Sequence, residues 1–128
     1  MIGKVITTLL KANTDLTDIV PGDRIFPYIM NEKTPLPGII YTVEDIDPQY
    51  TKDGLHNDIC SFTVASVSDN YNQLQDIVYQ VREALETEQG TFSGVQIKRI
   101  IMTGQDEAFS IQENVFINRL RFSTSIIY

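Results

Sequence analysis

Apolar residues recur along this chain with two periods, one typical of helices and one typical of strands. In residues 2–13 they follow helical spacing, which predicts an amphipathic helix at the start of the chain. The next segment, TDLTDIVPGDR, is rich in residues that favour turns, and Pro21-Gly22 ends the helical N-terminal region. A second stripe, from Leu74 to Leu85, follows the helix start signal Ser68-Asp69-Asn70 and predicts the second main helix.

Strand-like patterns fill most of the remaining chain. RIFPYI is a short extended piece that Pro27 confines to an edge or an irregular position. GIIYTVEDI is nearly continuously apolar over Ile39–Val43, as in a central strand, and DICSFTVASV is the next strand. The polar segment DPQYTKDG joins the two strands, which predicts a long hairpin. In the second strand one face holds Cys60, Phe62 and Val64, and the other holds Ile59, Thr63, Ala65 and Val67.

Two closing strands are expected in VQIKRIIMTG and ENVFINRLRFSTSIIY, with QDEAFSIQ as an acidic connection between them. From Val115 to Tyr128 the strand pattern would span roughly 45 Å at about 3.3 Å per residue. A domain of this size has a radius of gyration of about 14 Å. Such a strand either bends at a bulge or extends past the body, and its free edge is a natural place for another subunit to pair.

The order of these elements predicts an α+β fold. We expect a mostly antiparallel four-stranded sheet with two main helices packed on one face, a short N-terminal extended segment and long hairpin loops. Internal repeats, low-complexity tracts and Gly/Ser linkers are absent from the sequence, so residues 1–128 are expected to form a single domain. A chain of this length buries roughly two thirds of the surface that its unfolded form exposes.

The charge of the chain argues against binding to a nucleic-acid backbone. Ten scattered basic residues face 17 acidic ones, giving a net charge of −7, whereas nucleic-acid binding needs clustered Lys and Arg. An acidic surface instead favours solubility, or repels a polyanion that passes close by. The single cysteine excludes an intramolecular disulfide. We expect neither a signal peptide nor a membrane span.

The stretch DGLHNDIC holds the only histidine, His56, and the only cysteine, Cys60. Residues four apart on a strand lie about 13 Å from each other, whereas a catalytic dyad needs contact at about 3 Å. A zinc site needs more Cys or His than this chain has. We therefore interpret Cys60 as a small buried apolar residue and His56 as a solvated loop residue.

Other candidate chemistry is sparse. Asp45-Ile-Asp47 is like the start of a carboxylate metal loop, but the glycine and the terminal glutamate of a calcium-binding loop are missing. A general acid/base cluster would require convergence of Glu44, Asp45, Asp47, Asp53 and Asp58, which more simply form a solvated hairpin rim. No cofactor or metal site is expected. Phe109 either anchors an interface or folds back onto its own hairpin, and the sequence leaves both alternatives open.

The order of several short motifs resembles a known family. VITTLLKAN and TDLTDIV precede GDRIFP, TPLPGIIY and, at the end, NRLRFSTSIIY. This is similar to the small tail-completion, or tail-terminator, proteins of long-tailed bacteriophages and prophages. In that family a "GxRIYP"-like segment precedes an "xPxIVY"-like strand. Phe26 stands in place of the tyrosine, and the matching positions here are Gly22, Arg24, Ile25, Phe26, Pro27, Pro37, Ile39, Ile40 and Tyr41.

The resemblance covers nearly the whole chain and implies a structural virion protein with no catalytic residues to carry over. It implies a six-fold ring on the head-proximal end of the tail tube, which stops tube polymerisation and offers a surface for joining the head. The partners would be other copies of the chain, the tail tube protein and head-tail connector proteins, with DNA only passing through the lumen. The location would be the virion, and the host bacterial cytoplasm during assembly. Two alternatives stay open: another neck or connector protein, and a small ligand-binding α+β domain.

If a ring forms from head-to-tail contacts, each subunit needs two different contact surfaces. The candidate surfaces are the hairpin loop around Asp47–His56, the 105–113 connection and the free edge of Val115–Tyr128. The sequence predicts that Phe109→Asp, or deletion of Ser125–Tyr128, leaves a folded monomer and abolishes assembly. The candidate interface residues are Asp47, Tyr50, His56, Phe109, Ile111, Arg119, Arg121 and Tyr128.

Overall fold

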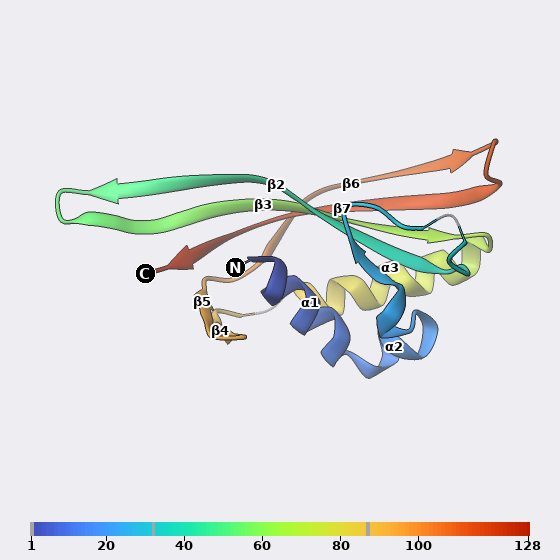
Figure 1. Ribbon diagram of the computed structural model, residues 1–128, viewed down its shortest axis with the longest axis horizontal. Helices are drawn as coiled ribbons and strands as arrows, with labels where there is room; N and C mark the ends of the chain where they lie inside the picture. The colour runs from blue at the N-terminus through green and yellow to red at the C-terminus, as the bar shows by residue number, and fades with distance from the viewer. Residues whose placement is uncertain (1, 32, 87) are drawn as a thin grey trace.

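Helices lie on one face of a long twisted sheet in the computed structural model, which describes residues 2–31, 33–86 and 88–128, and only the backbone of Leu55 (Figure 1). Within these residues there are three α-helices, one 3-10 turn and seven strands. The helical elements are α1 (Ile2–Ala12), α2 (Thr14–Ile19), η1 (Gly22–Arg24) and α3 (Tyr71–Leu85). The strands are β1 (Ile25–Pro27), β2 (Gly38–Thr51), β3 (Gly54–Ser68), β4 (Gly90–Phe92), β5 (Val95–Ile97), β6 (Ile101–Ser110) and β7 (Val115–Ile127).

The sheet order is β1-β2-β3-β7-β5-β4, and β6 pairs with β7 beside β5. The α+β class and the placement of the helices on one face are confirmed, but the expected four-stranded sheet is wrong. The described residues form seven strands, and the sheet is mixed because β1 pairs with β2 in parallel. Strands β1, β4 and β5 have three residues each, which is too short to establish a period-2 pattern.

The last strand does not have the free edge expected from the sequence. Strand β7 pairs with β3 from Phe116↔Ser68 to Ile127↔Asn57. Its other side pairs with β6 and, at Ile126, with β5. The length of β7 is therefore accommodated in the centre of a long sheet, and both of its edges are occupied by the chain's own strands (Figure 1).

Strand β6 takes in most of the segment expected as an acidic connection. It runs to Ser110, and a register shift between Met102 and Gly104 interrupts its pairing with β7. The predicted strand 95–104 divides at residues 98–100 into β5 and β6. Most side chains of β6 are exposed, so its sequence shows no continuous apolar face from which the strand could be predicted.

The hydrophobic core lies between the sheet and the helices. Both predicted helices are confirmed, and Asn70 caps α3 by accepting a hydrogen bond from the Gln73 N–H at 3.0 Å. The TDLTDI turn is a short helix, α2, which Asn13 caps through the Leu16 N–H at 3.0 Å. At the centre of the core the rings of Phe62 and Phe122 stack with centroids 5.4 Å apart. In the described part of the chain, no helix is long and apolar enough to cross a membrane.

Candidate interaction surfaces

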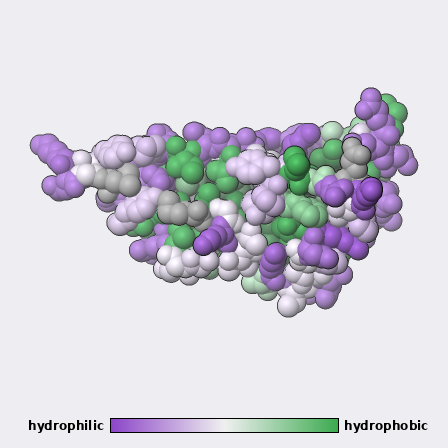
Figure 2. Space-filling model, viewed as in Figure 1, coloured by the Kyte–Doolittle hydropathy of each residue, from purple (hydrophilic) through white to green (hydrophobic). Residues whose placement is uncertain are grey.

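The β2–β3 hairpin projects beyond the rest of the molecule. We call Gln49–Asn57 the arm; Asn57 is the last β3 residue that pairs with β7 (Figure 1). Beyond that pair, the ladder continues between β2 and β3 through Tyr50↔Leu55 and Thr51↔Gly54, and the Tyr128 N–H adds a bond to the His56 carbonyl. Gly54 has a φ of +114°, which favours glycine and closes the turn after Lys52 and Asp53. The projecting end is hydrophilic in Figure 2.

The arm exposes Tyr50, and its secondary structure differs from the loop expected around His56. Tyr50 is 71% exposed, the highest value among the aromatic side chains of the described residues. His56 belongs to strand β3 and not to a loop, because the strand begins at Gly54. The expected solvation of His56 is confirmed, since its side chain is exposed. Its backbone carbonyl accepts a hydrogen bond from the Tyr128 N–H at 3.4 Å.

Cys60 is fully buried, as predicted, and its environment opposes reactivity. Burial, followed by the charge of Asp58, raises the pKa of the Cys60 thiol to about 11. Asp58 is itself only 7% exposed, and its carboxylate accepts a hydrogen bond from the Tyr128 hydroxyl at 2.6 Å. Because nucleophilic chemistry needs a thiolate, this environment suits a packing role for Cys60. Among residues 2–31, 33–86 and 88–128, no three Asp, Glu, His or Cys side chains converge as a metal site.

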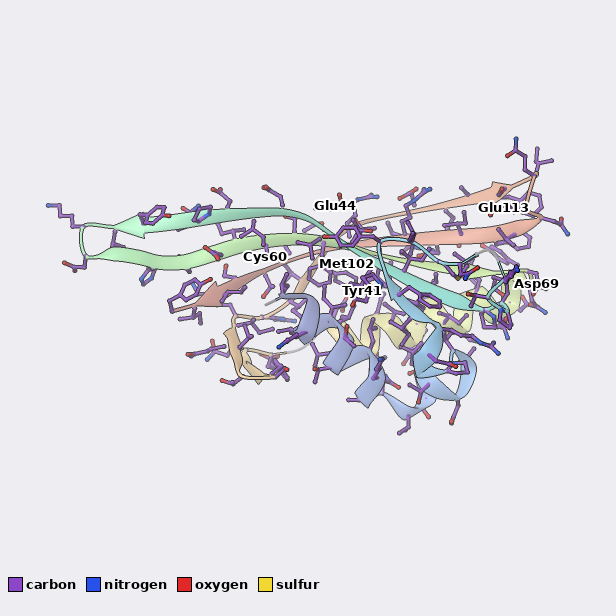
Figure 3. The ribbon with its side chains drawn as sticks, viewed as in Figure 1. Tyr41, Glu44, Cys60, Asp69, Met102 and Glu113 are labelled. Atoms are coloured by element: carbon purple, nitrogen blue, oxygen red, sulfur yellow. The ribbon has the colours of Figure 1, made fainter. Side chains whose placement is uncertain are left out.

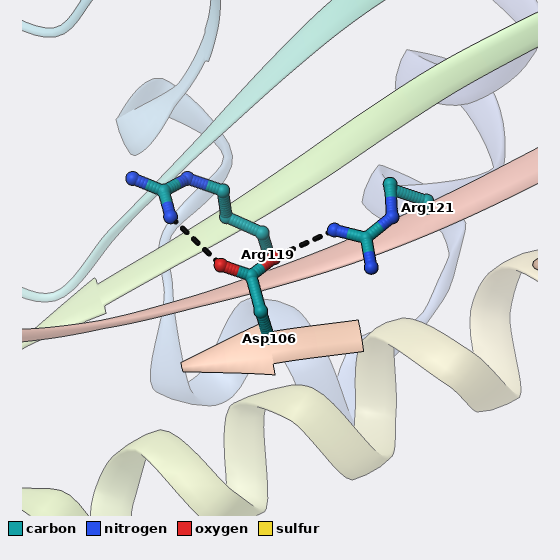
Figure 4. A network of polar contacts seen from close by, with 3 residues as sticks. All are labelled: Asp106, Arg119 and Arg121. Carbon is teal, nitrogen blue, oxygen red and sulfur yellow. Dashed lines mark hydrogen bonds and ion pairs between the residues drawn. The ribbon is translucent and has the colours of Figure 1, made fainter. Parts of the chain in front are cut away.

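Arg119 and Arg121 project from the face of the sheet that the helices leave uncovered, and both bind one carboxylate (Figure 4). Arg119 Nη1 and Arg121 Nη1 donate to the two Asp106 oxygens at 2.9 Å and 2.6 Å. The hydrogen bonds from Arg121 and Arg119 lower the pKa of Asp106. A Cβ at Gly104 would lie 2.6 Å from Arg121 Nη2, so the glycine at the register shift gives this guanidinium room.

Phe109 packs on its own hairpin and also remains partly accessible. Its ring centroid lies 4.8 Å from that of Phe116, and 46% of the residue is exposed. Tyr71 stacks edge-on against Phe116 at 5.3 Å, and its hydroxyl donates to Glu107 at 3.2 Å. Ile111, in the turn after β6, is 85% exposed. The structure therefore brings Phe109 and Ile111 to one end of the sheet, where the β6–β7 turn lies.

A cavity of about 350 Å³ lies close to the same turn. Its lining combines the loop before β2, the end of β3 and the start of β7, and we call it the loop cavity. Figure 3 places Glu113, which lines it, at the end of the molecule opposite the arm. A Cβ at Gly38 would lie 2.5 Å from the Met30 sulfur, so the missing side chain lets Met30 pack against the sheet there. The lining residues are Met30, Asn31, Thr34, Leu36, Val67, Glu113 and Val115.

The predicted interface residues thus fall into separate groups. Asp47, Tyr50 and His56 lie on the outer part of the β2–β3 hairpin, and Tyr128 bonds the backbone of His56. Arg119 and Arg121 lie on the open face, while Phe109 and Ile111 lie at the opposite end. Sequence reasoning missed the loop cavity, because its lining comes from distant segments of the chain. The only local indication is Ile29-Met30, an apolar pair in an otherwise polar, proline-bounded segment.

Comparisons with known proteins agree with this architecture. Residues 4–126 match the model of a family described as "Tail completion protein gp17". A solved chain from "Virion of native gene transfer agent (GTA) particle" superposes with a TM-score of 0.76 at 15% sequence identity. The match covers 97% of this chain and 92% of the solved one, which shows that the fold is shared. Comparison with curated protein sequences gave no significant match.

Proposed function

The chain belongs to the family of tail completion protein gp17, and from this membership we propose that it completes a phage-type tail as a ring-forming subunit. The match over residues 4–126 carries the proposal, because it spans nearly the whole chain. As a tail completion protein the chain is a structural component of a virion. The ring would have six-fold symmetry, sit on the head-proximal end of the tail tube, stop tube polymerisation and present a joining surface to the head.

The shape of the subunit supports assembly through unlike surfaces. One end of the long sheet carries the projecting arm, and the other carries the loop cavity and the β6–β7 turn (Figures 1 and 3). Contacts between unlike surfaces propagate from subunit to subunit, and they close into a ring when the rotation between neighbours fits. We expect no catalytic activity and no cofactor requirement, which agrees with the burial of Cys60.

DNA would pass through the ring without specific binding. The net charge of −7 suits a channel wall that repels the phosphate backbone. On the open face of the sheet, Asp106 balances part of the charge of Arg119 and Arg121. A structure of the assembled ring with a lumen lined by Arg and Lys would refute the acidic-channel hypothesis.

Negative-stain electron microscopy of the purified protein, alone and mixed with tail tubes assembled from the cognate tube protein, tests the proposed role. Rings, or tubes capped at one end and no longer growing, are the expected result. Single small particles in both samples would contradict the ring. Binding to purified portal or adaptor protein but not to tubes would favour a neck or connector role instead.

Phe109→Asp makes the same experiment sensitive to the predicted interface. Phe109 is 46% exposed, so a charge there should weaken contacts between subunits more than it weakens the fold. Tyr79→Asp is a matched control, because Tyr79 is 61% exposed on α3, away from the candidate surfaces. Normal ring formation by Phe109→Asp would remove this position from the interface.

A further inference from the structure

We propose that the arm of one subunit docks into the loop cavity of the next copy of this chain, with Tyr50 as its anchor. The inference rests on the proposed ring, and it assigns the two unlike surfaces from which that ring would be built. Both halves of the contact lie on the same polypeptide, at opposite ends of its long axis (Figures 1 and 3). A repeated contact between them is therefore heterologous, as a closed ring of identical subunits requires.

The loop cavity has the size and lining of a socket for one aromatic side chain. Its volume of about 350 Å³ lies near the lower end of the roughly 300–1,000 Å³ of small ligand sites. Apolar atoms come from Met30, Leu36, Val67 and Val115, and methionine adapts well to an aromatic ring. Asn31 and Thr34 add polar groups, which can bond the hydroxyl of a buried tyrosine.

Tyr50 has the properties of the matching anchor. It is 71% exposed and lies on the arm, beyond the part of β3 that pairs with β7. Tyrosine is enriched among the residues that dominate binding energy at interfaces, because it buries a large rigid surface. The arm can also enter a neighbouring subunit without disturbing the core, since among the described strands its end pairs only β2 with β3.

The charges at the two ends are complementary, which favours a second copy as the occupant. The turn of the arm carries Lys52, and the loop cavity carries Glu113 on its lining. The turn also carries Asp53, while Lys33 lies in the loop before β2 and lines a second pocket that shares Asn31 and Thr34 with the loop cavity. Docking of the arm into the loop cavity would bring Lys52 towards Glu113, and such charge matching fixes register and orientation at an interface. The tail tube end is the alternative occupant.

A charge-reversal cycle tests the contact between Lys52 and Glu113. Ring formation is counted by electron microscopy on tail tubes for Lys52→Glu, for Glu113→Lys and for the double variant. Each single reversal should lower ring yield at least fivefold, and the double variant should recover to within twofold of the unaltered protein. Lys98→Glu and Glu88→Lys are matched controls, because both residues are exposed elsewhere on the molecule. Tyr50→Ala should abolish rings, and Tyr79→Ala should not.

Disulfide trapping identifies the occupant directly. Lys52→Cys protein with a mass tag is mixed with untagged Glu113→Cys protein and oxidised under the conditions of ring formation. The native Cys60 is fully buried with a raised thiol pKa, so it should contribute little background. We expect the tagged–untagged heterodimer in at least fivefold excess over either homodimer.

The outcomes separate this inference from the proposed function. The arm contact would be overturned, and the ring retained, by one combination of results. In it the unaltered protein forms rings, the charge reversals do not change ring yield, and the tagged–untagged heterodimer is no more abundant than random pairing predicts. Trapping of the Lys52→Cys arm on the tube protein would assign the arm to the tube and also overturn the inference. Failure of the unaltered protein to form rings, even on tubes, would refute both.

Discussion

The burial of Ile126 makes the end of β7 essential for stability. Ile126 is only 2% exposed and pairs with Ile97 of β5 and Asp58 of β3. A chain ended at Thr124 loses this side chain and also the Tyr128 hydroxyl that bonds the buried Asp58 carboxylate. Removal of Ser125–Tyr128 is therefore predicted to destabilise the fold, and the expectation of a folded monomer has to be revised.

The expected loss is a large part of the stability of a typical domain. Truncation of a buried isoleucine side chain costs about 2–5 kcal/mol. Loss of one hydrogen bond to a buried carboxylate adds about 1 kcal/mol, less than the roughly 1.5–3 kcal/mol of bonds to charged groups, because Tyr128 is half-exposed. The combined loss of about 3–6 kcal/mol compares with a total free energy of unfolding of about 5–15 kcal/mol.

Urea unfolding followed by far-ultraviolet circular dichroism measures this loss. The variants are the truncated chain, Ile126→Ala, Tyr128→Phe and the unaltered protein. Ile126→Ala should account for most of the lost free energy of unfolding, and Tyr128→Phe for a smaller share. A truncated chain within about 1 kcal/mol of the unaltered protein would refute the argument, because a buried isoleucine cannot be removed at so small a cost.

Three further predictions follow from individual side chains. Asn118→Leu should raise the free energy of unfolding by about 1–2 kcal/mol. The reason is that both polar atoms of the fully buried Asn118 side chain have no hydrogen-bond partner within the described residues. A urea midpoint lower than that of the unaltered protein would contradict this prediction. The hydrogen bond to Asp58 raises the pKa of Tyr128 from 10.0 to about 12, so its contribution to stability is complete below pH 10 and is lost as the pH rises towards 12. Ultraviolet titration should show a late phenol that Tyr128→Phe removes, and an unchanged titration curve would argue against the bond. Asp106→Asn should leave the urea midpoint unchanged, because the two ion pairs of Asp106 are exposed. It should also lengthen retention on a heparin column at low salt, because a negative charge beside two arginines is removed. A large drop in the urea midpoint would show that the two ion pairs stabilise the fold.

Sequence reasoning succeeded where an apolar face packs against the core. Helices α1 and α3 and strand β3 each bury one face against a single layer, which leaves a periodic apolar pattern in the sequence. Their positions could therefore be predicted from that pattern. The interpretation of Cys60 as a buried packing residue rested on the same alternation. The sequence predicts loops for the arm and for residues 105–110 of β6, because exposed strands carry polar residues on both faces and lose that periodicity.

The pairing of strands that lie far apart in the chain could not be predicted from the sequence either. The pattern of β7 indicates a long strand, but it does not reveal that β5 and β6 share its second edge. Tyr50 and Ile111 could be proposed as surface residues, since both lie in polar segments. The loop cavity could not, because Met30, Val67 and Val115 meet only in the folded molecule.

The central position of β7 determines when this molecule can fold. Its ladder with β3 joins residues far apart in the chain, from Ser68 with Phe116 to Asn57 with Ile127. Contacts of such long range form slowly, and here they have to wait until β7 has left the ribosome. Until then the apolar faces of α1 and α3 have only part of the sheet to cover them. A chain that ends before β7 would therefore expose apolar surface that chaperones and proteases recognise.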